Sequence, residues 1–210
     1  MTTRSLHLDK VDYKVAFGLS LFTILANLVE GVASTVLGFQ DDTLALFGFG
    51  VDSFIEVISA VGIVIMILRI LKNPNSTQNK YEISALRITG TGFYLLVAGL
   101  IITSIIKLIN GSRPDTTVWG IIISLISLSV MIFLYFFKMR VGRKLNSEAI
   151  IADANCTKVC IYMSVVLLIS SLAYSLFGFA LLDIIGALGI AYFSFTEGRE
   201  AFERAAEKVE

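Results

Sequence analysis

Six long apolar stretches, separated by short polar segments, dominate the pattern along the chain. A stretch of about 20 apolar residues is long enough to cross the hydrocarbon core of a bilayer as a helix. The breaks between stretches carry loop-forming residues, such as NPNS at 73–76 and NGSRP at 110–114. The pattern therefore predicts an all-α integral membrane fold with six transmembrane helices, over 14–39, 43–71, 83–109, 118–137, 147–174 and 179–196.

The composition agrees with a membrane protein. Hydrophobic residues make up 56% of the 210 residues and charged residues 16%, whereas soluble domains have roughly 45–50% and 25%. This argues against a water-soluble enzyme, and we expect neither catalysis nor a prosthetic group. The 17 basic residues balance the 17 acidic ones, so the charge gives no indication of a nucleic-acid partner. A single histidine, His7, excludes a site built from several histidines.

The basic residues predict the orientation in the membrane, because cytoplasmic loops are enriched in Lys and Arg. Of the 17 basic residues, only Lys107 and Arg113 fall on the side of the membrane opposite the termini, and Lys158 lies within a span. The other 14 share the side of the termini. We therefore expect both termini to be cytoplasmic in a multi-pass protein of a prokaryotic cell membrane. The expected parts are a cytoplasmic N-terminal segment (1–12), a six-helix transmembrane domain (13–196) and a cytoplasmic helical tail (197–210). On the cytoplasmic side we place Arg4, Lys10, Lys14, Arg69, Lys72, Lys80, Arg87, Lys138, Arg140, Arg143, Lys144, Arg199, Arg204 and Lys208.

Ionisable side chains inside the predicted spans are the strongest indication of function. Each charge in the hydrocarbon costs about 2.5–3.5 kcal/mol on the insertion scale, so such residues are usually retained for a purpose. Six lie well inside the spans: Glu30, Asp52, Glu56, Asp153, Lys158 and Asp183.

Asp52 and Glu56 form the clearest pair, since a spacing of four residues places both on one helix face, one turn apart. Their mutual repulsion and their loss of hydration favour the protonated acids, and a divalent cation would displace those protons. The alternative is a structural pair satisfied by Lys158 or by buried water.

Cys156 and Cys160 repeat this spacing on the fifth predicted helix. Two sulfurs one turn apart can bind one metal ion, although buried cysteines are also common without any such role. Lys158 lies half a turn from each cysteine, where a cation favours thiolates. We prefer the interpretation that Lys158 forms a structural ion pair with Glu30, Asp153 or Asp183. The acids that do not pair with Lys158 would be secondary polar contacts or groups of a proton pathway.

Two short segments carry a resemblance to a known family. The sequence VDSFIE at 51–56 resembles the second-helix motif of the cation diffusion facilitator family, and DANCTKVC at 153–160 resembles its fifth-helix motif. The resemblance covers about residues 10–205. It implies six helices with cytoplasmic termini, a homodimer, and export of a metal ion from the cytoplasm. It also implies a tetrahedral transport site, which by position consists of Asp52, Glu56, Cys156 and Cys160.

The sequence departs from the family pattern at several points. Glu56 stands where the family usually has Asp, and both cysteines stand where His and Asp are common. The segment 72–82 contains no histidine, and we expect the family's cytoplasmic C-terminal domain to be absent. Thiolates favour soft or borderline ions, whereas magnesium and calcium prefer oxygen. We therefore expect zinc, with cadmium, mercury, copper and iron as further substrates.

Metal binding to protonated ligands expels protons, which gives a route to proton antiport. The lipid bilayer, the metal ion and protons are thus the expected partners, together with a second copy of the chain. Two alternatives share the intramembrane carboxylates. One is a proton-coupled exporter of organic cations, which would not need the cysteines. The other is a membrane metal sensor that binds without transporting.

Overall fold

The computed structural model describes residues 3–72, 80–111, 113–115, 117–145 and 147–207. Within these residues the chain forms six α-helices and no strands, so the predicted all-α fold is confirmed. Each helix is long and apolar enough to cross a membrane. The helices are α1 (Thr3–Gln40), α2 (Leu44–Lys72), α3 (Lys80–Asn110), α4 (Val118–Lys144), α5 (Glu148–Phe177) and α6 (Leu181–Glu207).

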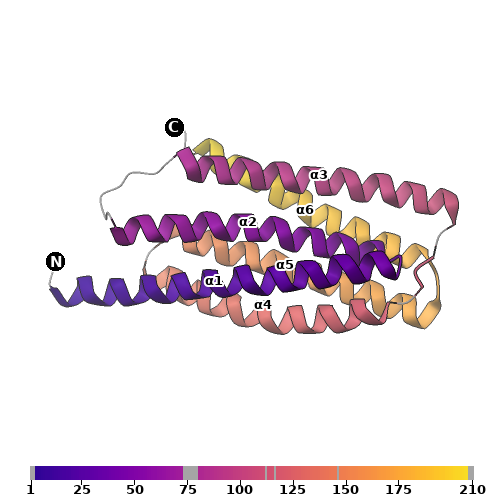
Figure 1. The fold of residues 1–210 in the computed structure, drawn as a ribbon, viewed down its shortest axis with the longest axis horizontal. Coiled ribbons are helices and arrows are strands. Elements are labelled where there is room, and N and C mark those ends of the chain that lie inside the picture. The colour runs from indigo at the N-terminus through magenta and orange to yellow at the C-terminus, as the bar shows by residue number, and fades with distance from the viewer. Residues whose placement is uncertain (1–2, 73–79, 112, 116, 146, 208–210) are drawn as a thin grey trace.

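The helices run lengthwise beside one another, and α1 begins at the same end of the bundle at which α6 ends (Figure 1). The most extensive contacts pair α1 with α2, α4 with α5, and α3 with α6. Helix α2 also contacts α3, α5 and α6, which makes it the central element. Large apolar side chains such as Val29, Leu95 and Ile126 are exposed on the outer faces, as expected where helices meet lipid.

Two glycines have defined structural roles, one where α1 and α2 pack closely and one at the end of α5. A Cβ atom on Gly50 would lie 2.5 Å from the backbone nitrogen of Thr35, so only glycine allows the two helices to come this close. Gly178 ends α5 in the left-handed conformation (φ 68°), and its N–H donates to the carbonyl of Tyr174. This is the usual way in which glycine terminates a helix before a tight turn.

Several helices extend beyond the predicted spans. Helix α4 continues from residue 137 to Lys144, and its last turn carries Arg143 and Lys144, which interact favourably with the free carbonyls of a helix end. Helix α6 continues without a break through residue 196 to Glu207. The proposed division of the chain at 196 stays a prediction, but residues 197–207 are part of the same packed helix.

A buried carboxylate at the other end of the bundle connects α6 to α2. Asp183 accepts hydrogen bonds from the backbone nitrogens of Leu44 (2.8 Å) and Ala45 (3.1 Å). These two N–H groups belong to the first turn of α2, where they have no partner within the helix. Lys107 of α3 lies 4.0 Å from the same carboxylate and 2.9 Å from that of Asp42. Asp183 therefore caps α2 and is itself held by a cation.

A buried ion pair connects α4 to α5. Lys138 Nζ lies 2.9 Å from Asp153 Oδ2, and both side chains are buried. The ammonium also donates to the hydroxyl of Thr157 at 3.0 Å. The expected structural ion pair of Lys158 was therefore wrong: among the described residues, none of its three possible partners, Glu30, Asp153 and Asp183, pairs with it. Lys158 instead lies over the ring of Tyr162, 5.9 Å from its centroid, so it points along the outer surface of α5.

Replacing Asp183 by alanine should destabilise the protein by about 1–3 kcal/mol, because two buried N–H groups of α2 lose their acceptor. Denaturant-induced unfolding of the purified chain in detergent measures this change. Asp115 is exposed, and D115A serves as the matched control, with little expected change. Equal stability of D183A and D115A would show that Asp183 does not cap α2.

Replacing Lys138 by methionine should destabilise the chain by about 3–5 kcal/mol, since it leaves Asp153 buried without a counter-charge. The double variant K138M/D153N should recover much of this loss because no uncompensated charge remains. Arg199 pairs with Glu203, and both side chains are exposed (67% and 59%), so R199M should cost at most about 1 kcal/mol. The prediction fails if K138M and R199M unfold at the same denaturant concentration.

Candidate metal centre

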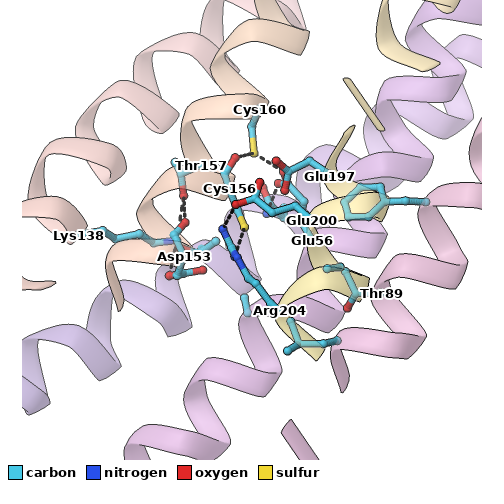
Figure 2. Close-up of a pocket in the computed structure, with 16 residues that line it drawn as sticks. Glu56, Thr89, Lys138, Asp153, Cys156, Thr157, Cys160, Glu197, Glu200 and Arg204 are labelled. Atoms are coloured by element: carbon cyan, nitrogen blue, oxygen red, sulfur yellow. Dashed lines mark hydrogen bonds and ion pairs between the residues drawn. The ribbon is translucent and has the colours of Figure 1, made fainter. Parts of the chain in front are cut away.

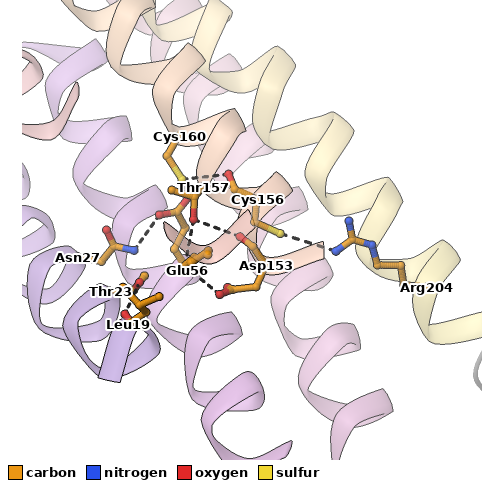
Figure 3. A network of polar contacts seen from close by, with 10 residues as sticks. Leu19, Thr23, Asn27, Glu56, Asp153, Cys156, Thr157, Cys160 and Arg204 are labelled. Atoms are coloured by element: carbon orange, nitrogen blue, oxygen red, sulfur yellow. Dashed lines mark hydrogen bonds and ion pairs between the residues drawn. The ribbon is translucent and has the colours of Figure 1, made fainter. Parts of the chain in front are cut away.

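The carboxylate of Glu56, in the middle of α2, is the point at which three helices meet. Its Oε2 accepts a hydrogen bond from Asn27 Nδ2 of α1 at 2.8 Å. Its Oε1 accepts from the thiol of Cys160 on α5. Figure 3 shows Asn27 to the left of Glu56 and Cys160 above it. Glu56 and Cys160 were predicted to share one site, and the structure brings their side chains into direct contact.

Cys156 lies one turn from Cys160 on the same face of α5, as the four-residue spacing predicts. Its sulfur faces α6 rather than α2. There it lies in the same pocket as Glu197, and it accepts a hydrogen bond from Arg204 Nη1 at 3.7 Å. Figure 2 shows the guanidinium of Arg204 reaching toward the Cys156 sulfur. The two thiols thus contact different partners in this arrangement.

Asp52 is buried one turn from Glu56 on α2. Its Oδ1 accepts a hydrogen bond from the hydroxyl of Ser194 on α6 at 3.3 Å. The carboxylate also interacts electrostatically with Glu56 and Glu197. Asp52 therefore belongs to the same acidic cluster but is turned toward α6.

Glu30 of α1 is connected to this cluster through the neighbouring serine. Ser53 Oγ donates to Glu30 Oε1 at 2.9 Å, and it follows Asp52 directly in the chain. The role of Glu30 in a proton pathway stays a prediction.

The four predicted ligands lie close together without yet surrounding a single point. In the part of the chain that the structure describes, no three His, Cys, Asp or Glu side chains converge closely enough to hold a metal ion. Carboxylates and thiols bond instead to one another, to Ser194 and to Arg204. An ion bound by all four would require Asp52 and Cys156 to turn away from α6, so the ligand assignment stays a prediction.

A pocket runs along this cluster between the helices. Its lining includes Glu56, Asp153, Cys156, Cys160, Glu197 and Arg204 (Figure 2). Two further lining groups, Asn27 Oδ1 and Thr89 Oγ1, are buried and lack a hydrogen-bond partner among the described residues. Carboxylate, amide and hydroxyl oxygens together with two thiols are all potential donors to a cation.

Glu197 and Arg204 were not predicted to belong to the site. Glu197 was expected in the cytoplasmic helical tail, and Arg204 was expected to be one of the basic residues that set the orientation in the membrane. Both lie in the pocket because α6 stays packed to its end, and Glu197 is only 7% exposed. A signal was present in the sequence: Ser194, Gly198 and Ala201 continue the helical stripe of small residues that packs inward.

Comparison with known proteins agrees with this arrangement. Residues 20–207 match the family described as the cation efflux transmembrane domain. The manganese efflux system protein MneP of Bacillus subtilis is 26% identical over 151 residues, covering 70% of this chain and 49% of that protein. An uncharacterized transporter of Methanocaldococcus jannaschii is 24% identical over 183 residues, covering 83% and 64%. The magnetosome protein MamB of Paramagnetospirillum magneticum is 26% identical over 171 residues, covering 79% and 57%.

The chain spans about half to two thirds of the length of these relatives. The family match, in contrast, extends over most of the chain and includes all six helices. The resemblance of the second and fifth spans to cation diffusion facilitators is therefore confirmed. The chain is an integral, multi-pass membrane protein that belongs to the cation efflux family.

Proposed function

We propose that this chain exports a divalent transition-metal ion from the cytoplasm, with Asp52, Glu56, Cys156 and Cys160 as its ligands. The observation that carries this proposal is the contact between Glu56 of α2 and Cys160 of α5 inside the bundle. Oxygen and sulfur donors from two helices at one buried point form half of a tetrahedral shell. Asp52 and Cys156, each one turn away, supply the other half after a change of side-chain rotamer.

The thiols favour a soft or borderline ion, with zinc or cadmium ahead of mercury, copper and iron. One relative is named for manganese efflux, and manganese prefers oxygen donors. The pocket offers such oxygens on Asn27, Glu56 and Glu197. The two substrates differ in one respect that can be tested, because zinc or cadmium transport requires the cysteines and manganese transport does not.

Proton exchange follows from the chemistry of the proposed ligands. The hydrogen bond from Cys160 to Glu56 requires a proton between sulfur and oxygen. A metal ion that binds both atoms takes the place of that proton, so binding releases it. Release of the metal on the opposite face, followed by protonation, would complete an antiport cycle.

The basic residues near the start of α1 and the ends of α2, α4 and α6 support a cytoplasmic position for this end of the bundle. We propose a homodimer in a prokaryotic cell membrane. The lining of the pocket beside Glu56 includes Lys138 and Arg204, from the cytoplasmic parts of α4 and α6 in this orientation. We propose that the metal ion is taken up from that side.

The variants C160A and E56Q should each reduce zinc or cadmium flux into proteoliposomes at least about tenfold, since each removes one ligand of the shell. S129A and E203Q serve as matched controls. Ser129 is an exposed residue whose hydroxyl bonds only to its own helix, and the side chain of Glu203 is 59% exposed. Undiminished flux in C160A would contradict the thiol ligand. In that case, competition by organic cations or a preference for manganese would identify the alternative substrate.

Adding zinc or cadmium to the purified protein in a weakly buffered solution should release protons, and acidification should weaken metal binding. The sign follows because the free ligands carry protons that the bound ligands have lost. The pH change measured during titration should be smaller for C156A/C160A than for the wild type. Tight binding with proton release but without flux down a metal gradient would favour a sensor over a transporter.

A further inference from the structure

Arg204 brings a fixed positive charge into the pocket that we propose for the metal. It lies near the end of α6, and its side chain is 23% exposed. Nη1 donates to Cys156 Sγ at 3.7 Å, while Nη2 forms an ion pair with Glu200, one turn earlier on the same helix. Figure 2 shows the guanidinium between α6 and the Cys156 sulfur. The sulfur of Cys156, a predicted metal ligand, therefore already contacts a positively charged side chain of the protein.

The other arginine of this segment shows that the arrangement is not a general feature of α6. Arg199 forms an ion pair with Glu203, also one turn away, but the two side chains are 67% and 59% exposed. Such a pair lies at the surface and contributes little. Arg204 has the same local spacing to its acid and yet turns into the pocket, where it meets Cys156.

We propose that Arg204 is a built-in counter-cation that the incoming divalent metal ion must displace from Cys156. This inference rests on the proposed transport function. A guanidinium cannot lose its charge by deprotonation in a protein. Two cations beside one sulfur repel each other strongly in a partly buried pocket, where the effective dielectric constant is low. Metal binding at Cys156 therefore requires the side chain of Arg204 to move.

The surroundings of Arg204 allow such a movement. Glu200 retains the guanidinium after it leaves the sulfur, and the side chain of Glu200 is 47% exposed. Glu197 lines the same pocket as Cys156 and provides an additional oxygen donor there. Displacement also imposes a selection by charge, because a monovalent cation gains less from the cluster than a divalent ion does.

Equilibrium binding of cadmium to the full chain in detergent tests the proposal, with the ultraviolet thiolate-to-cadmium charge-transfer band as the signal. R204Q removes the competing charge and should bind cadmium roughly tenfold more tightly. R204K keeps the charge and should bind as the wild type does, and R199Q should be unchanged. A merely structural Arg204 would have the opposite effect, so equal or weaker binding by folded R204Q overturns the proposal.

A second measurement uses the wild-type chain and does not depend on the folding of any variant. Modification by the arginine reagent phenylglyoxal is followed by mass spectrometry with and without cadmium. Cadmium should accelerate modification of Arg204 several-fold and leave Arg199 unchanged. If the absorption band shows bound cadmium but Arg204 reacts no faster, the inference alone is overturned. If the wild type shows no band, the thiol ligation in the proposed function fails, and the inference fails with it.

Discussion

Glu56 accepts hydrogen bonds from Asn27 of α1 and Cys160 of α5, and the centre of the bundle is organised around this carboxyl group. A membrane interior provides no water to satisfy such a group, so the protein must supply every partner from its own helices. The same requirement fixes how α1, α2 and α5 face one another. It also places a thiol against a carboxylate, which is the chemistry that a metal site needs.

The other buried charges satisfy the same requirement, each through a residue of a different helix. Asp153 of α5 pairs with Lys138 of α4, and Asp183 of α6 caps the first turn of α2. These contacts tie distant parts of the chain together near the site and at the opposite end of the bundle. Polar residues that cost free energy in lipid thereby specify one arrangement of six otherwise apolar helices.

Helix α6 has two roles: it packs against α3, and it contributes side chains to the candidate site. Its small residues pack inward along its whole length, and the glycine at 198 allows the close approach of Phe93 and Tyr94 from α3. The same helix carries Ser194, Glu197 and Arg204 to the candidate site. Helix α6 therefore packs against α3 and also contacts Asp52 and Cys156, two of the predicted ligands.

The sequence by itself determined the six spans, because span length depends only on local hydropathy and bilayer thickness. It also determined that Asp52 with Glu56, and Cys156 with Cys160, share a helix face, since helical spacing is local. The partners of the long charged side chains were decided only by the tertiary structure. Lys138 and Arg204 were predicted only to set the orientation in the membrane, yet both side chains turn inward. A long, flexible side chain can reach an acid or a thiol on a neighbouring helix, and the position of that partner is not a local property of the sequence.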